Sequence, residues 1–296
     1  MTPTLHRLPV GETPHHLALY DWGNPDASRV TVCVHGLTRN ARDFDFLAQQ
    51  LVATGRRVIA ISMAGRGDSE WLADPMGYTY ATYVTDCLAV LDNFHLREVE
   101  WVGTSMGGII GMILASQRPG RIRKLILNDI GARISAAALA RIYAYVRTMP
   151  RQFADRAEAE AYLRIVFAPW GVADTPAWPA LVESSLIARD GVLRYACDPA
   201  IVVPINAAAK QFEATQEVDL SPFWSEIQIP TLILHGADSD ILDRDTITAM
   251  RATNLNTQSI SFPGIGHAPA LMDSAQTAPI LEWLDRSLSD RMALGF

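Results

Sequence analysis

The sequence predicts an α/β protein with a mostly parallel β-sheet flanked by helices. Short runs rich in β-branched residues alternate with longer segments in which apolar residues recur at three- and four-residue spacing. Most of the short runs are apolar almost throughout, which is typical of strands that are covered on both faces. Because strand and helix patterns alternate in this way, we expect a parallel sheet with helices packed on its faces.

The expected elements follow in chain order. Two weaker runs that suit an antiparallel edge come first, at 4–10 and 15–23. Apolar strands are then expected at 29–36, 57–62, 98–104 and 124–129. The helical patterns between these strands lie at 41–54 and 80–94. Later in the chain, strands are expected at 231–236 and 257–264, and helices at 244–252 and 275–289.

The middle of the chain has a different pattern. From Ile134 to about Ser221 the sequence shows helical patterns and loops without a convincing strand. A helical block between two strands of one sheet is an insertion, so we expect a helical cap over the carboxyl edge of the sheet. The chain would then consist of core residues 1–133, a cap at 134–221 and core residues 222–296.

Composition narrows the class of protein. The chain has 296 residues, 49% hydrophobic and 19% charged, as in an ordinary soluble enzyme. A net charge of −7 without a basic cluster argues against a nucleic-acid partner or an anionic membrane. The three cysteines lie in apolar stretches without a CxxC pair, which favours reduced thiols and no metal site. No leader pattern or membrane-spanning run is present in the sequence, so we expect a cytoplasmic protein without a membrane partner.

The segment Gly103-Thr104-Ser105-Met106-Gly107 joins an expected strand directly to an apolar helix. The carboxyl end of a central strand is where open α/β sheets bind their ligands. A sharp turn there leaves little room, and the two outer glycines remove side chains that would collide. Ser105 would expose its hydroxyl beside helix N–H groups, which favour developing negative charge. A helix-capping serine is the alternative, but the strand–turn–helix context favours a nucleophile elbow.

A nucleophilic serine needs a base, and two histidines follow Ser105 in the chain. His235 ends the apolar strand 231–236 and is expected to be a buried strand-end residue. His267 lies in a glycine-flanked loop after the last strand, where its imidazole could reach the same crevice. A surface histidine is the alternative, but the partner serine favours His267 as the general base.

The imidazole in turn needs an orienting carboxylate, and the turn after the strand 231–236 offers Asp238 and Asp240. Such a turn usually carries the acid three residues after its glycine, where this chain has Ser239. A one-residue insertion favours Asp240, because an apolar pair follows it directly. Asp238 stays open, and one of the two is expected to be a cap or turn residue.

The oxyanion formed on attack needs donors. Gly36 ends the strand 29–36 and lets the chain turn across the crevice. The backbone N–H groups of Leu37 and Met106 are therefore expected to form the oxyanion hole. His35, directly before this turn, is expected to be a hydrogen-bonded structural residue rather than a second base.

Five motifs together carry a family resemblance: VHGLT, AGRGDS, GTSMGG, HGADSD and GIGHAP. In order and spacing the chain resembles the capped α/β-hydrolase superfamily over nearly its whole length. The resemblance implies an eight-stranded sheet and no cofactor. It also implies the roles already assigned to Ser105, Asp240, His267, Leu37 and Met106.

An elbow serine favours acyl transfer over the alkyl-enzyme chemistry of relatives with an aspartate at this place. We therefore predict a carboxylesterase-like serine hydrolase that cleaves a small ester, thioester or lactone through an acyl-enzyme. Its partner would be a small-molecule acyl substrate, and the sequence leaves the substrate and the oligomeric state open. Arg39 could meet a substrate carboxylate, although a surface salt bridge is the simpler interpretation.

Two other functions are considered. A carbon–carbon bond hydrolase acting on dienoic ring-fission products ranks second. Relatives of that kind usually have Asn where this chain has Thr104, and a glycine-rich oxyanion loop. A non-catalytic ligand receptor on the same fold ranks third, because a pure binding protein has no need of a serine, an acid and a histidine together.

Overall fold

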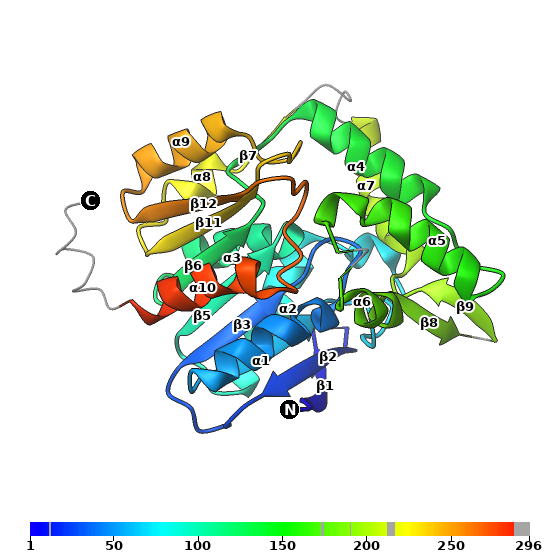
Figure 1. The fold of residues 1–296 in the computed structure, drawn as a ribbon, viewed down its shortest axis with the longest axis horizontal. Helices are drawn as coiled ribbons and strands as arrows, with labels where there is room; N and C mark the ends of the chain where they lie inside the picture. The colour runs from blue at the N-terminus through cyan, green and yellow to red at the C-terminus, as the bar shows by residue number, and fades with distance from the viewer. Residues whose placement is uncertain (12, 173–174, 190, 212–216, 287–296) are drawn as a thin grey trace.

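The computed structural model describes residues 1–11, 13–172, 175–189, 191–211 and 217–286. At its centre is an eight-stranded sheet (Figure 1). From one edge to the other, the strands are β1 (Thr4–Val10), β2 (His15–Trp22), β4 (Arg57–Ser62), β3 (Val30–Val34), β5 (Val99–Thr104), β6 (Ile122–Asn128), β11 (Thr231–Gly236) and β12 (Thr257–Phe262). The β1–β2 and β2–β4 pairs are antiparallel, and the other neighbours are parallel.

This architecture confirms the predicted α/β fold with a mostly parallel sheet of eight strands. Strands β3, β4 and β11 are buried along their whole length. Burial on both faces explains why the sequence has unbroken apolar runs there. The edge strand β1 is largely exposed, which accounts for its weaker pattern.

Helices cover both faces of the sheet. Buried residues of α1 (Asp45–Ala53) and α10 (Ser274–Asp285) form one apolar cluster with alternate residues of the strands. Figure 1 shows these two helices on the same side of the sheet. The opposite cluster contains residues of α2 (Tyr80–Asn93), α3 (Met106–Gln117), α8 (Ser221–Trp224) and α9 (Arg244–Thr253). The alternation follows from the two-residue period of a strand, which sends successive side chains to opposite faces.

The segment between β6 and β11 forms a further group of elements at one side of the sheet (Figure 1). The helices of this group are α4 (Ala136–Thr148), α5 (Arg156–Val166), α6 (Trp178–Ser185) and α7 (Val202–Gln211), whereas α8, at the end of the same segment, packs against the sheet. The short strands of this group are β7 (Arg133–Ile134), β8 (Leu186–Arg189), β9 (Val192–Tyr195) and β10 (Val218–Asp219). The same segment contains 3₁₀ turns at Ala168–Trp170 and Pro199–Ile201, and two more lie before it, at Ala41–Phe44 and Pro75–Gly77.

These short strands correct the expectation that the middle of the chain holds only helices and loops. β8 and β9 pair antiparallel, and so do β7 and β10. The sequence carries an Asp-Gly pair at 190–191, a common hairpin signal, but the flanking runs are too short to stand out as strands. The division into core 1–133, cap 134–221 and core 222–296 stays a prediction. Among the described residues, no helix is both long and apolar enough to cross a membrane.

Candidate active site

Ser105 lies at the sharp turn between β5 and α3. Its backbone has φ 50° and ψ −112°, a conformation that non-glycine residues rarely adopt. The turn leaves no room for side chains on either side. A Cβ on Gly103 would lie 2.3 Å from the backbone of Gly107, and one on Gly107 would lie 2.0 Å from the carbonyl oxygen of Val34. The glycine spacing of the sequence is therefore a steric requirement of this turn.

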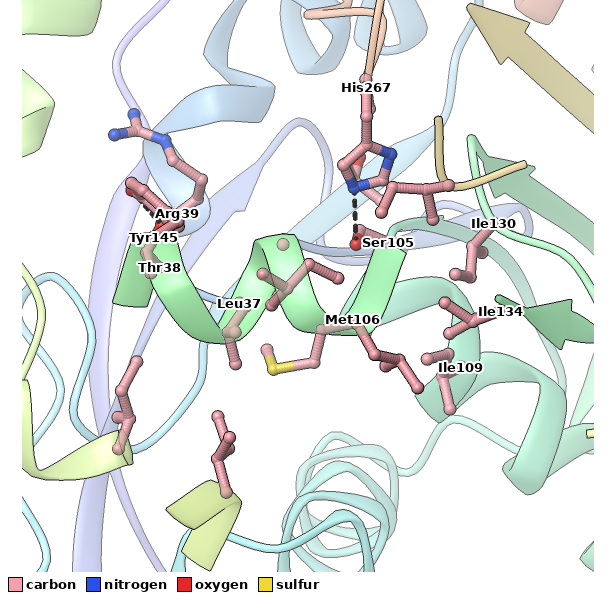
Figure 2. Close-up of a pocket in the computed structure, with 18 of the residues that line it drawn as sticks. Leu37, Thr38, Arg39, Ser105, Met106, Ile109, Ile130, Ile134, Tyr145 and His267 are labelled. Carbon is pink, nitrogen blue, oxygen red and sulfur yellow. Dashed lines mark hydrogen bonds between the residues drawn. The ribbon is translucent and has the colours of Figure 1, made fainter. Parts of the chain in front are cut away.

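His267 follows β12 and points at this serine. Its Nε2 lies 2.9 Å from the Ser105 Oγ, and Figure 2 shows this contact as a dashed line. The other ring nitrogen, Nδ1, lies 2.7 Å from the Oδ2 of Asp129. Because a carboxylate only accepts hydrogen bonds, Nδ1 carries the proton and Nε2 accepts from the serine hydroxyl. The structure thus brings together the predicted serine and histidine.

The carboxylate beside His267 belongs to Asp129, directly after β6. This side chain is 0% exposed, and its carboxylate accepts hydrogen bonds from three groups. Besides the imidazole, the Gly236 N–H donates to Oδ1 at 2.8 Å and the Ser239 hydroxyl donates to Oδ2 at 2.6 Å. Charge-assisted hydrogen bonds of this kind offset the cost of burying a carboxylate. The contacts also fix the direction in which the carboxylate meets the imidazole.

The prediction that Asp240 meets His267 is wrong. Asp240 has a 51% exposed side chain and pairs with Arg141 of α4, whose Nη2 lies 2.8 Å from Oδ1. Asp238 is exposed as well. The turn after β11 directs Ser239 toward Asp129, and the aspartates on either side of this serine face outward.

A signal for Asp129 was present in the sequence. The residue lies between Ser105 and His267 in the chain and follows an apolar strand. That strand, β6, lies between β5 and β11 in the sheet. An acid at its carboxyl end is therefore as close to the crevice as one after β11. Identifying this acid from the sequence would have required the order of the strands in the sheet, which periodicity alone does not give.

Leu37 and Met106, the residues expected to supply the oxyanion donors, lie on the same wall of the pocket as Ser105 (Figure 2). Among the described residues, neither the Leu37 nor the Met106 backbone N–H has a hydrogen-bond acceptor. The Gly107 N–H donates to the carbonyl of His35 at 3.1 Å, which ties the two turns together. Both free N–H groups are thus held on turns fixed to each other.

His35 stabilises the turn at Gly36 through two hydrogen bonds of its ring. Its Nε2 accepts the Met63 N–H at 3.0 Å, so Nδ1 carries the proton and donates to the Gly36 carbonyl at 2.7 Å. The ring is fully buried, and this burial lowers the pKa of His35 to about 3. The neutral ring therefore has a structural role, as the sequence suggested.

A cavity of about 700 Å³ opens above Ser105 and His267. Side chains from the sheet edge and from the segment between β6 and β11 line it together. Its wall is mostly aliphatic and aromatic, including Leu37, Tyr83, Met106, Ile109, Ile113, Ile130, Ile134, Leu139, Ile142, Tyr143, Tyr145, Phe167, Trp170, Ile205, Leu220, Phe223 and Ile241. The charged residues of the lining are Arg39, Asp43, Arg66 and Arg141, with His267 as the ionisable base. Within the described ranges, no group of three or more His, Cys, Asp or Glu residues could hold a metal ion.

Known proteins are similar to this chain in fold and in sequence. Residues 30–165 match the family model described as the alpha/beta hydrolase fold. A 3-hydroxybutyrate-oligomer hydrolase from Cupriavidus necator is 39% identical over 270 residues, which are 89% of this chain and 91% of that protein. The solved structure of an alpha/beta hydrolase from Novosphingobium aromaticivorans has 32% identity and a TM-score of 0.85, and the match covers 97% of this chain and 99% of that one. A solved structure from Rickettsia typhi reaches 34% identity and a TM-score of 0.87 over 97% of this chain and 100% of that one.

The chain therefore belongs to the α/β-hydrolase superfamily. Several of the proteins similar to this chain are named as hydrolases. These names agree with the hydrolase class that the fold and the turn at Ser105 indicate.

Proposed function

We propose that this protein is a serine hydrolase that cleaves a small aliphatic ester through an acyl-enzyme. The observation that carries the proposal is the continuous hydrogen-bonded chain from the Ser105 hydroxyl through His267 to Asp129. Ser105 would be the nucleophile, His267 the general base and Asp129 the residue that orients the imidazole. The Leu37 and Met106 N–H groups would hold the oxyanion, each contributing about 3 kcal/mol in the transition state.

The reaction would proceed in two displacements. The Ser105 Oγ forms a bond to the ester carbonyl carbon while His267 Nε2 takes the hydroxyl proton. The tetrahedral intermediate then collapses, the bond to the alcohol oxygen breaks, and the imidazolium returns the proton to the departing alcohol. Water, deprotonated by the same imidazole, attacks the acyl-enzyme and releases the acid and free Ser105.

The size and composition of the cavity support a short aliphatic substrate. A volume of about 700 Å³ lies within the usual range for small-molecule sites, and its wall is mostly apolar. The Cupriavidus necator relative is named for hydrolysis of 3-hydroxybutyrate oligomers, and it aligns along most of both chains. We therefore propose soluble oligomers of a short 3-hydroxy acid as the substrate class. The cytoplasmic location expected from the sequence remains part of this proposal.

Replacement of the serine tests the proposal. We expect Ser105→Ala to remove hydrolysis of short-chain p-nitrophenyl esters and of the linear 3-hydroxybutyrate dimer. Wild-type protein should also lose activity when a fluorophosphonate labels it, with the adduct found by mass spectrometry on the peptide that contains Ser105. Ser116→Ala is a matched control, because Ser116 lies on the same helix and its hydroxyl donates to the helix carbonyl of Ile113.

The same experiment separates the other candidate functions. Turnover of a dienoic ring-fission product in preference to both esters would favour a carbon–carbon bond hydrolase. Binding of the dimer without turnover would favour a receptor. Full ester hydrolysis by Ser105→Ala would place the nucleophile elsewhere and refute the proposal.

A further inference from the structure

The charged residues of the cavity wall are predominantly positive, although the chain as a whole has a net charge of −7. Three arginines and one aspartate, Asp43, contribute to the lining. An apolar cavity concentrates the field of such charges, because little water is present to screen them. The three arginines differ in whether a substrate could reach them.

The positive charge of Arg39 is already paired with a carboxylate of the protein. Its Nε and Nη2 both donate to the carboxylate of Asp43, and Nη1 donates to the hydroxyls of Ser185 and Tyr195. Figure 2 shows its guanidinium turned away from Ser105. The side chain is buried, so the surface salt bridge expected from the sequence is in fact an internal one.

Arg66 is charged but out of reach. Its side chain is 0% exposed, and its N–H groups donate to the carbonyls of Leu37 and Ala64 and to the Tyr83 hydroxyl. No carboxylate of the described residues lies within ion-pair distance of it. Its guanidinium lies 5.5 Å from the centre of the Tyr78 ring, and the Tyr78 hydroxyl donates to Asp198. Arg66 therefore adds positive potential to the wall without offering a binding group.

Arg141 is the accessible arginine of the lining. Its side chain is 49% exposed, so it lies where the cavity meets solvent. Its planar guanidinium pairs through two nitrogens with Asp240, which is 51% exposed and lies in the turn after β11. An exposed ion pair of this kind contributes little to stability, so its partner can be exchanged at low cost. A guanidinium also matches any other carboxylate in the same two-point geometry.

We propose that Arg141 binds the carboxylate of an aliphatic ester substrate at the mouth of the cavity, with the substrate replacing Asp240. This inference rests on the ester hydrolase function proposed above, and it assigns the residue that recognises the free carboxylate of such a substrate. The aliphatic part would lie against the apolar wall, and the carbonyl would reach Ser105. Asp240 would keep Arg141 in place until the substrate arrives and would compete with the substrate for it.

Two substrates that differ by one charge test the inference. The linear 3-hydroxybutyrate dimer carries a carboxylate, and its methyl ester does not. Hydrolysis of the internal ester bond is followed by chromatography of the products, and the ratio of kcat/KM for the acid to that for the methyl ester is compared. We expect Arg141→Gln to lower this ratio at least tenfold, mainly through a higher KM for the acid.

Asp240→Asn is expected to change the ratio in the opposite direction. Removal of the competing carboxylate should raise the ratio about threefold, because Arg141 keeps its charge and loses its partner. Arg147→Gln is a matched control, since Arg147 is exposed on the same helix but does not line the cavity. Melting temperatures of the three variants report on folding.

The possible failures are distinct. An unchanged ratio in Arg141→Gln would overturn the inference, and so would an equal decrease in both Arg141→Gln and Asp240→Asn, which indicates that the pair only holds the structure. In either case, hydrolysis that still depends on Ser105 leaves the proposed ester hydrolase intact. Hydrolysis of neither substrate, or hydrolysis that survives Ser105→Ala, would instead refute the proposed function itself.

Discussion

The indole N–H of Trp170 donates a hydrogen bond to the carbonyl oxygen of His267 at 2.8 Å. One residue earlier in each segment, the Gly266 N–H donates to the carbonyl of Pro169 at the same distance. A Cβ on Gly266 would lie 2.9 Å from the Pro169 ring, so the loop approaches this closely only because residue 266 is glycine. The segment between β6 and β11 thus holds the loop that carries the proposed base.

We expect Trp170→Phe to lower kcat for ester hydrolysis about tenfold. The ring that stacks on Phe167 at 4.4 Å would remain, but the donor to the His267 loop would be lost. A displacement of about 1 Å in a reacting group can cost about a hundredfold in rate, so a loosened loop should act mainly on kcat. Steady-state kinetics over a range of pH values measure both parameters.

Trp178→Phe is the matched control for this variant. The indole N–H of Trp178 also donates a hydrogen bond within the segment between β6 and β11, but its acceptor is Glu160, at 2.7 Å, and not the His267 loop. If both variants lower kcat alike, the effect of Trp170 is general destabilisation of the segment rather than positioning of His267.

The assignment of the acid gives a second prediction. Asp129→Asn should lower kcat by at least a hundredfold, because an asparagine amide can hold the imidazole in the wrong tautomer. The corresponding change in a serine protease costs about 10⁴-fold. Asp238→Asn, at the other position that the sequence offered besides Asp240, should retain wild-type kinetics. Activity of Asp129→Asn within tenfold of the wild type would mean that another carboxylate orients His267.

The outcome for the acid shows which part of the site the sequence can predict. Ser105 is fixed by a local steric motif, and His267 by its place after the last strand, so both follow from neighbouring residues. The acid depends on which strands lie side by side in the sheet. β6 and β11 are adjacent, although about a hundred residues separate them, and either could supply a carboxylate to the same crevice. Local pattern does not distinguish the two strand ends.

The same reasoning applies to the fold. The buried strands β3, β4 and β11 were predictable because burial on both faces leaves an unbroken apolar signature. The hairpin of β8 and β9 was not, because each strand has four residues and their burial is mostly partial. A distant residue also joins this hairpin, because the Phe153 N–H donates to the Leu193 carbonyl at 2.9 Å, and local pattern does not reveal such a contact.

The glycine at the far side of the serine turn gives a third prediction. We expect Gly107→Ala to lower the free energy of unfolding by about 3 kcal/mol or more, or to prevent folding, because its Cβ would overlap the Val34 carbonyl at 2.0 Å. Gly120→Ala is the comparison. No atom lies within 4 Å of a Cβ at that position, and only its positive φ of 87° adds strain, about 1 kcal/mol. Equal unfolding free energies for the two variants, measured in urea, would contradict the steric account of the turn.

The buried imidazole of His35 predicts how stability depends on pH. Burial lowers the pKa of His35 from 6.5 to about 3, so between these values the unfolded chain binds a proton that the folded protein does not. Stability is therefore complete above about pH 6.5 and decreases as the pH falls toward 3. Between pH 7.5 and pH 5.0 this single residue should cost about 2 kcal/mol of unfolding free energy.

Urea unfolding of the wild type and of His35→Gln at both pH values isolates the contribution of His35, because the two proteins share all other titrating groups. His35→Gln should be less stable than the wild type at pH 7.5, since the contacts with Met63 and Gly36 are disturbed, but it should lose about 2 kcal/mol less on acidification. An equal loss in the two proteins would show that His35 takes up its proton in the folded state, and the neutral ring would then not be what holds the Gly36 turn.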